Sequence, residues 1–240
     1  MADMTMLAVG GIADPTGIVL WLVAWFVTIG LHEGGHAWVA WWLGDDTAYL
    51  LGKRSINPLR HIDFKDQKSL IYTVAMPVIS TIAGFLPMGL AWVPVNPSKF
   101  RHPTRDMAIT SAAGPAGNLV GAILGAAVFV LAVYLFRKTG QPGTQISDYI
   151  SLSLLYEFGV RMVLLNILLG VVNLVPLPGV DGGAILYHFM NYRGRQLYDR
   201  LAPYGLMIFI LVVITVGRPL LGSVMEFGVA VLEKLSNLVS

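Results

Sequence analysis

The sequence predicts an all-α polytopic membrane protein, a multi-span helical bundle, and two observations carry that prediction. Of the 240 residues, 55% are hydrophobic and only 12% are charged, whereas an ordinary soluble domain has about 25% charged residues. The hydrophobic residues are also gathered in blocks of about twenty or more, which is the length that crosses a bilayer as a helix. We therefore expect most of the chain to lie in the lipid bilayer.

The first hydrophobic block covers residues 16–43 and is long enough to cross the bilayer. The polar stretch 44–68 follows, and its alternating segment 47–51 predicts short strands, that is, a small β-like insertion at the membrane surface. The next block, 69–93, is interrupted by proline and glycine at Pro77, Gly84, Pro87 and Gly89. Such a segment can enter the membrane and return when it packs against protein, so we expect a re-entrant or surface segment here.

Four blocks read as firm spans: 16–43, 107–136, 149–175 and 201–217. The final stretch, 219–240, carries Glu226, Glu233 and Lys234, which predicts an amphipathic interfacial helix or a weak span. No internal repeat or second soluble domain is visible. We therefore expect one membrane domain over residues 1–240, with a core at 16–190 and a C-terminal span and tail at 201–240.

A metal-binding pattern lies inside the first block, where residues 32–36 read His-Glu-Gly-Gly-His and fit HExxH. Residues four apart share one face of a helix, with Cβ atoms about 5–6 Å apart, so His32 and His36 can reach one tetrahedral zinc ion. Glu33 then lies beside the metal, where it can accept a proton from water. Each charged group in a membrane span costs about 2.5–3.5 kcal/mol, so a functional site is favoured over a polar contact between helices or a group of interfacial residues.

A catalytic zinc needs a third protein ligand. The chain has no cysteine, which excludes thiolate sites, disulfides and a cysteine nucleophile. Val39 and Trp42 occupy the positions of Gly and His in the longer pattern HExxHxxGxxH, so we expect an acidic ligand. The candidates away from obvious loops are Asp106, Glu157, Asp181 and Glu226. Only Asp181 follows a span broken by prolines and glycines, which allow tight turns; the alternative for Asp181 is a helix N-cap.

These motifs resemble those of the site-2 protease family, in the compact bacterial and archaeal branch without appended PDZ or CBS domains. HEGGH matches the family's HExxH, and Asn173 to Gly182 matches its pattern N-x-x-P-x-P-x-x-D-G at full spacing. Further matching segments follow the family order at 44–48, 56–63, 93–97 and 113–118. Gly179 and Trp92 depart from the family pattern but leave the ligands intact.

The resemblance implies an intramembrane zinc metalloprotease that cleaves transmembrane segments of other membrane proteins, the reaction of regulated intramembrane proteolysis. It makes His32, His36 and Asp181 the Zn²⁺ ligands and Glu33 the general base, and it places Asn118 and Asn173 near the substrate or the oxyanion. The expected partners are single-span membrane proteins and the bilayer; the net charge of +2 gives no indication of a nucleic-acid partner. The rival interpretation is a zinc transporter or a non-catalytic metal-binding membrane protein, which leaves Glu33 unexplained.

The basic residues favour a block 69–93 that does not cross the membrane. With such a block, the cytoplasmic loops hold eleven Lys and Arg residues, whereas full crossing leaves eight inside and six outside. The positive-inside rule selects the first topology. It predicts a multi-pass protein of the cell (inner) membrane with its active site toward the cytoplasm. The eleven residues are Lys53, Arg54, Arg60, Lys65, Lys68, Lys99, Arg101, Arg105, Arg193, Arg195 and Arg200.

Three smaller features of the sequence concern an ion pair, the two motif glycines and the remaining histidines. Glu157 and Arg161, four residues apart, predict a membrane-buried ion pair more readily than a functional site. Gly34 and Gly35 either give a substrate strand room to approach the metal or allow close helix packing. The remaining histidines lie beside predicted interfaces and are interpreted as surface groups: His61, His102 and His188.

Overall fold

The computed structural model describes residues 14–139 and 146–238, and within those ranges it contains helices and no strand. The elements are α2 (Pro15–Trp42), α3 (Thr47–Leu50), η1 (Pro58–Arg60), α4 (Gln67–Ser69), η2 (Leu70–Ala75), α5 (Met76–Ile82), η3 (Pro97–Lys99), α6 (Pro103–Thr139), α7 (Ile146–Asn173), α8 (Asp181–Phe189), α9 (Tyr192–Leu201), η4 (Ala202–Tyr204) and α10 (Gly205–Leu238). Three helices are long and apolar enough to cross a membrane: α2, α6 and the part of α7 from Tyr149 to Asn173. The protein is therefore a helical membrane protein.

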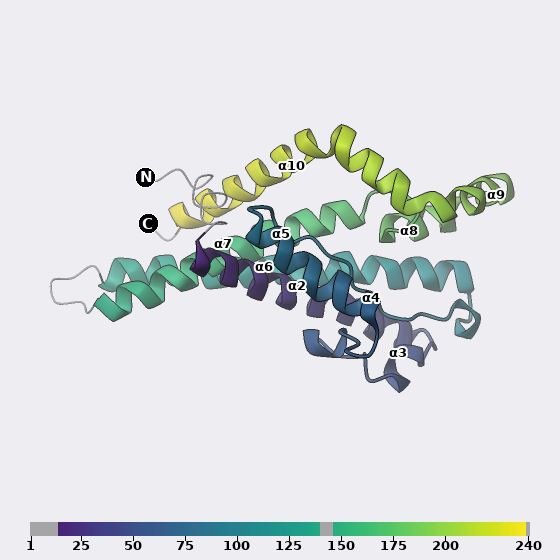
Figure 1. Cartoon of the computed structure of the whole chain (residues 1–240), viewed down its shortest axis with the longest axis horizontal. Helices are drawn as coiled ribbons and strands as arrows, with labels where there is room; N and C mark the ends of the chain where they lie inside the picture. The colour runs from purple at the N-terminus through teal and green to yellow at the C-terminus, as the bar shows by residue number, and fades with distance from the viewer. Residues whose placement is uncertain (1–13, 140–145, 239–240) are drawn as a thin grey trace.

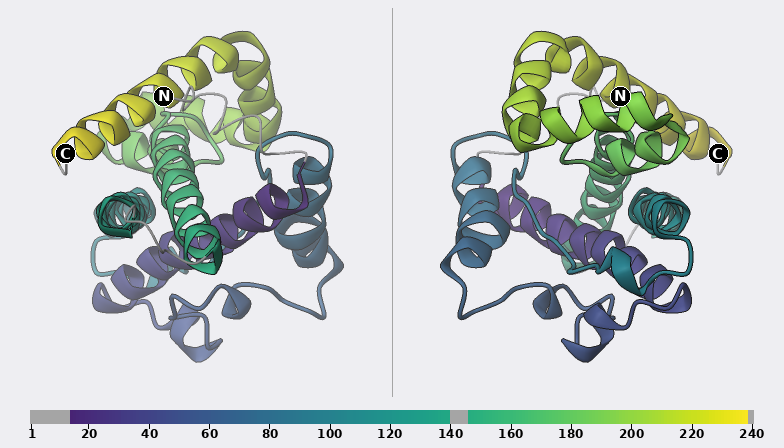
Figure 2. Two further views of the ribbon diagram at one scale, coloured as in Figure 1. Left: turned by 90° about the vertical axis from the view of Figure 1, so that its left-hand side faces the viewer. Right: turned by 90° about the vertical axis from the view of Figure 1, so that its right-hand side faces the viewer.

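The three candidate spans lie along the long axis of the molecule, with α2 and α7 running in one direction and α6 in the other (Figure 1). Helix α7 is central because it contributes to both buried apolar clusters. Its residues Met162 and Leu165 pack with Trp21 and Trp25 of α2. On another side, Val160, Val163 and Leu164 pack with residues of α6 and α10, namely Phe129, Val133 and Leu232. Seen along the long axis, α10 and the segment α4–α5 lie on different sides of this bundle (Figure 2).

The predicted β-like insertion at 44–68 is wrong, because these residues form helical turns. The reason lies in short polar side chains that bind nearby backbone N–H groups. Asp45 accepts a hydrogen bond from Thr47 N (3.0 Å), Asn57 from Leu59 N (3.0 Å) and Asp66 from Lys68 N (3.1 Å). Side chains that bond to the backbone two residues onward stabilise turns and compete with strand pairing.

The interrupted block 69–93 starts as helix and ends extended. After α5 the chain runs back beside η2, where Leu90 N donates to Tyr72 O (3.0 Å) and Thr73 Oγ1 donates to Leu90 O (2.8 Å). Farther along, Asn96 N donates to Asp45 Oδ2 (2.6 Å). Because Asp45 lies just beyond α2, the chain comes back to the end of α2 that it left, and α6 begins from there (Figure 1).

The C-terminal region also differs from the prediction. The expected span and tail are not separate elements, because one helix, α10, runs through Gly205–Leu238 after α9 and η4. Pro219 lies inside α10, which bends along its length (Figure 1). A proline removes one backbone donor and kinks a helix without always ending it. The described residues contain three candidate spans, and the predicted fourth span at 201–217 stays a prediction.

His61 is another correction, since it is only 1% exposed rather than a surface group. Its Nε2 donates to Ser55 O at 2.7 Å. The loop that carries it packs directly on α2, where a Cβ on Gly30 would lie 2.2 Å from Ile56 O. Burial of the His61 ring lowers its pKa below the ordinary value.

Candidate metal centre

Three predicted ligands come together at one end of the bundle. His32 and His36 lie one turn apart on α2, and Asp181 is the first residue of α8. The two Nε2 atoms are 3.1 Å apart, and they lie 3.3 Å (His32) and 3.4 Å (His36) from the Asp181 carboxylate oxygens. A tetrahedral zinc with ligands at about 2.0–2.1 Å separates its ligand atoms by about 3.3 Å. The distances from His32 and His36 end on different oxygens of Asp181 (Oδ2 and Oδ1); with one ligand atom from each residue, the three atoms lie within 4.8 Å of one another, close enough to share one metal ion.

The protonation pattern of these groups also fits a cation. His36 Nδ1 lies 2.7 Å from Thr110 O, and because a carbonyl only accepts, Nδ1 carries the hydrogen. His36 Nε2 therefore faces His32 and Asp181, and the neutral ring offers a lone pair there. Asp181 Oδ2 is buried and accepts no hydrogen bond. A metal ion can bind the lone pairs that converge here, and it can compensate the buried carboxylate oxygen that no hydrogen-bond donor reaches.

The turn before α8 delivers Asp181 to this position. Gly179 has a φ of +95°, a left-handed conformation that favours glycine. Val180 then takes the N-cap position of α8 without a side-chain hydrogen bond, and Asp181 follows as the first helical residue. The N-cap interpretation of Asp181 is therefore wrong: its carboxylate faces the two imidazoles.

Glycines let three backbones approach the site. A Cβ on Gly114 of α6 would lie 2.4 Å from His36 Nε2 and 2.6 Å from His32 Cε1. Within the HEGGH motif, a Cβ on Gly35 would lie 2.4 Å from Ala113 O, and one on Gly34 would lie 2.9 Å from Ser55 O. Both motif glycines thus allow close packing, the second of their two predicted roles.

Glu33 lies beside the ligands in a small cleft. The cleft has a volume of about 80 Å³. Its walls come from α2, from the end of α7 and from the extended segment 89–91, and they comprise Trp25, Ile29, His32, Glu33, Gly89, Leu90, Ala91, Leu169 and Asn173. Asn173 Nδ2 donates to Leu169 O at 3.0 Å. Asn118 is not in this lining; it is 1% exposed and its Oδ1 lies 2.6 Å from His32 Nδ1.

The structure adds residues that the sequence analysis missed. Thr110 O holds His36, and Asn166 Nδ2 donates to Thr28 Oγ1 at 2.9 Å between α7 and α2. Asn166 could have been found as a polar residue inside an apolar span, where such groups are costly. Thr110 could not, because it acts through its main-chain carbonyl.

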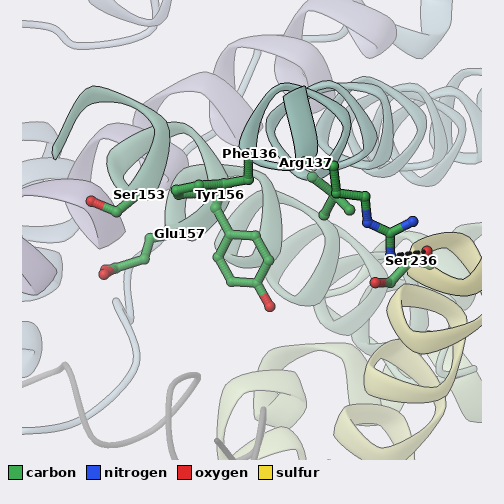
Figure 3. A pocket seen from close by; sticks show the side chains of 7 residues that line it. Phe136, Arg137, Ser153, Tyr156, Glu157 and Ser236 are labelled. Carbon is green, nitrogen blue, oxygen red and sulfur yellow. Dashed lines mark hydrogen bonds between the residues drawn. The ribbon is translucent and has the colours of Figure 1, made fainter. Parts of the chain in front are cut away.

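A larger cavity, of about 450 Å³, lies between α6, α7 and α10 and has no predicted metal ligand in its walls (Figure 3). The cavity is lined by residues 133–137 near the end of α6 and 153–157 near the start of α7. The metal site lies by the other ends of these two helices. Glu157 lines it and pairs with buried Arg161 at 3.0 Å along α7, which confirms the predicted ion pair. Arg137 also lines this cavity and donates to Ser236 O (3.3 Å). We assign the cavity no part in the metal chemistry.

Comparison with known proteins finds a peptidase family and relatives that are named as zinc metalloproteases. The model for peptidase family M50 matches residues 20–216. The "Putative zinc metalloprotease YwhC" of Bacillus subtilis (strain 168) is 28% identical over 198 residues, which are 81% of this chain and 80% of the relative. The "Putative zinc metalloprotease Rip2" of Mycolicibacterium smegmatis is 27% identical over 200 residues, 82% of this chain and 67% of the relative. No solved structure matches the chain significantly.

Proposed function

The chain belongs to peptidase family M50, the site-2 protease family, and is a zinc metalloprotease; we propose that His32, His36 and Asp181 hold the zinc and that Glu33 is the general base. The observation that carries the assignment is the convergence of two imidazoles of α2 with the carboxylate of Asp181, at contacts of 3.1–3.4 Å, although Asp181 is distant from them in the chain. Glu33 lines the same cleft as His32. A general base for a metal-activated water has to lie in such a position.

The residues of the cleft have different roles in peptide hydrolysis. When bound, zinc supplies Lewis acidity, which polarises a peptide carbonyl and makes water a better nucleophile. Glu33 accepts the proton of the attacking water and then gives it to the leaving amine. Asn173 uses one amide hydrogen on Leu169 O, so its second is available to the substrate backbone.

We propose single-span membrane proteins as substrates, cleaved within or beside the bilayer. A helical substrate hides its carbonyls in its own hydrogen bonds, so it must unwind locally before cleavage. The cleft is small, about 80 Å³, and its wall includes the extended segment 89–91. We expect this segment to move aside when a substrate strand enters.

We further propose that block 69–93 enters the membrane and returns, and that the site opens toward the cytoplasm of a cell-membrane protein. The hydrogen bonds of Leu90 with Tyr72 and of Asn96 with Asp45 support this topology, because they bring the chain back to where the block began. So do the opposite directions of α2 and α6 (Figure 1), because the intervening chain then begins and ends on one side. In this topology the eleven basic residues of the cytoplasmic loops lie on that side, in agreement with the positive-inside rule.

The function is tested by paired measurements on wild type and Glu33→Gln. The variant keeps the size of the side chain but removes the base. Zinc should stay bound, while cleavage of a panel of single-span substrates should fall by at least the ~10²–10⁴-fold typical of a lost acid–base group. A chelator should abolish cleavage by wild type. Cleavage at the wild-type rate by zinc-loaded Glu33→Gln would contradict the mechanism, and zinc flux without cleavage would favour a transporter.

A further inference from the structure

A group of buried polar side chains on three helices lies beside the metal centre. His32 and Thr28 belong to α2, Asn118 to α6 and Asn166 to α7, and all four are at most 8% exposed. Asn118 Oδ1 lies 2.6 Å from His32 Nδ1, and Asn118 Nδ2 lies 3.4 Å from Asn166 O. Asn166 Nδ2 donates to Thr28 Oγ1, one turn before His32, and so joins α7 to α2. Polar groups buried in membrane helices are costly and call for a specific role.

The chemistry of His32 defines what its neighbour must do. Its Nε2 faces His36 and Asp181, so a neutral His32 that binds zinc carries its hydrogen on Nδ1. That hydrogen needs an acceptor. Thr110 O provides one for His36 at 2.7 Å, and Asn118 Oδ1 provides one for His32 at 2.6 Å. Helix α6 therefore holds both ligand histidines through their Nδ1 atoms.

The Asn118 amide also has an opposite orientation, and that orientation is incompatible with zinc. Turned over, its nitrogen would donate to Gly114 O (3.0 Å) and His32 Nδ1 (2.6 Å), and its oxygen would accept from Gly170 N (3.2 Å). These bonds satisfy the amide, whereas with Oδ1 toward His32 the amide oxygen also faces Gly114 O and the amide nitrogen faces Gly170 N–H. It is therefore a hydrogen on His32 Nδ1 that favours the orientation with Oδ1 toward His32. The bonds of the turned-over amide require His32 Nδ1 to be an acceptor, however, which moves the imidazole hydrogen to Nε2, the atom that faces the metal. The amide orientation and metal binding are therefore coupled.

On the basis of the proposed zinc ligands, we infer that Asn118 is a positioning residue that holds His32 in the ring orientation and tautomer that zinc binding requires. Asn166 and Thr28 keep α7, α6 and α2 in register around it. This role differs from the substrate or oxyanion contact that the family resemblance implies for Asn118. Its side chain is 1% exposed and does not line the cleft, whereas Asn173 does.

The test compares Asn118→Leu with Asn118→Asp. Zinc dissociation constants are measured on the purified protein in detergent, by competition with a chromophoric chelator. Leucine offers no acceptor, so zinc affinity should fall by the 10–100-fold typical of lost ligand-orienting groups. Aspartate accepts from Nδ1–H, as in carboxylate–histidine–zinc triads, so its affinity should stay near the wild-type value. The visible spectrum of the Co²⁺-substituted protein should change in Asn118→Leu only.

The substrate-contact role predicts a different pattern, because neither leucine nor a carboxylate donates a hydrogen bond. Both variants would then bind zinc like wild type and lose cleavage, which would overturn the inference. Equal loss of zinc affinity in both variants would overturn it too, since aspartate restores the acceptor. Asn118→Ala replaces the leucine variant if the latter is not monodisperse.

Asn173→Leu is the matched control, because it removes an amide from the cleft that touches no ligand. It should lower cleavage and leave zinc affinity unchanged; a fall in zinc affinity equal to that of Asn118→Leu would overturn the inference, since the effect would not depend on contact with His32. The proposed function fails separately, namely if wild type binds no zinc or if His36→Ala binds it normally.

Discussion

Substituting Gly114 by alanine should remove the metal while leaving the helix intact. The added Cβ would lie 2.4 Å from His36 Nε2, whereas ordinary van der Waals contact begins at 3.4 Å. The His36 ring would therefore have to move by about 1 Å, and His32 Cε1 at 2.6 Å blocks part of the available space. Metal–ligand distances tolerate only about ±0.2 Å, so we expect zinc binding and cleavage to be lost together.

The measurement is zinc content per chain after dialysis, with helix content and thermal unfolding as fold checks. Alanine is favoured over glycine in a helix by about 1 kcal/mol, so a weakened α6 would not explain the loss. Gly222→Ala is the matched control, because a Cβ there meets no atom within 4 Å. Full zinc content and wild-type cleavage in Gly114→Ala would refute the geometry of the site.

Three other predictions address the ligands, the topology and a buried histidine. Wild type should hold about one zinc ion per chain, lowered in each of His32→Ala, His36→Ala and Asp181→Ala; full retention in all three would exclude this site. Because the chain has no cysteine, single introduced cysteines can be labelled without background. Cysteines at Ser98 and Asn191 should react with reagent from the cytoplasm, and one at Lys138 should react from outside. Labelling at Ser98 only from outside would mean that block 69–93 crosses the membrane. Burial lowers the pKa of His61, so the unfolded chain takes up a proton first as the pH falls through about 6.5. Stability should therefore be present above that pH and decline below it, and His61→Gln should flatten the decline in thermal unfolding between about pH 7 and pH 5; an unchanged slope would contradict the role of His61.

Local sequence patterns were sufficient for the features that depend on neighbouring residues. Hydrophobic blocks predicted the spans α2, α6 and α7, and the four-residue spacing placed His32 and His36 on one helix face. The proline and glycine turn identified Asp181 as the acid able to leave a regular helix. The same local reasoning failed for 44–68, where alternation suggested strands but Asp45, Asn57 and Asp66 stabilise helical turns.

Only the tertiary structure decided what holds the ligands in place. His36 is held by Thr110, 74 residues away in the chain, and His32 by Asn118, 86 residues away. Asn166 meets Thr28 across 138 residues. No local periodicity encodes contacts at such separations, because they arise only when α2, α6 and α7 pack together. The sequence by itself therefore indicated which groups can bind zinc, and the packing of three helices determined which groups lie against the Nδ1 atoms of the two histidines.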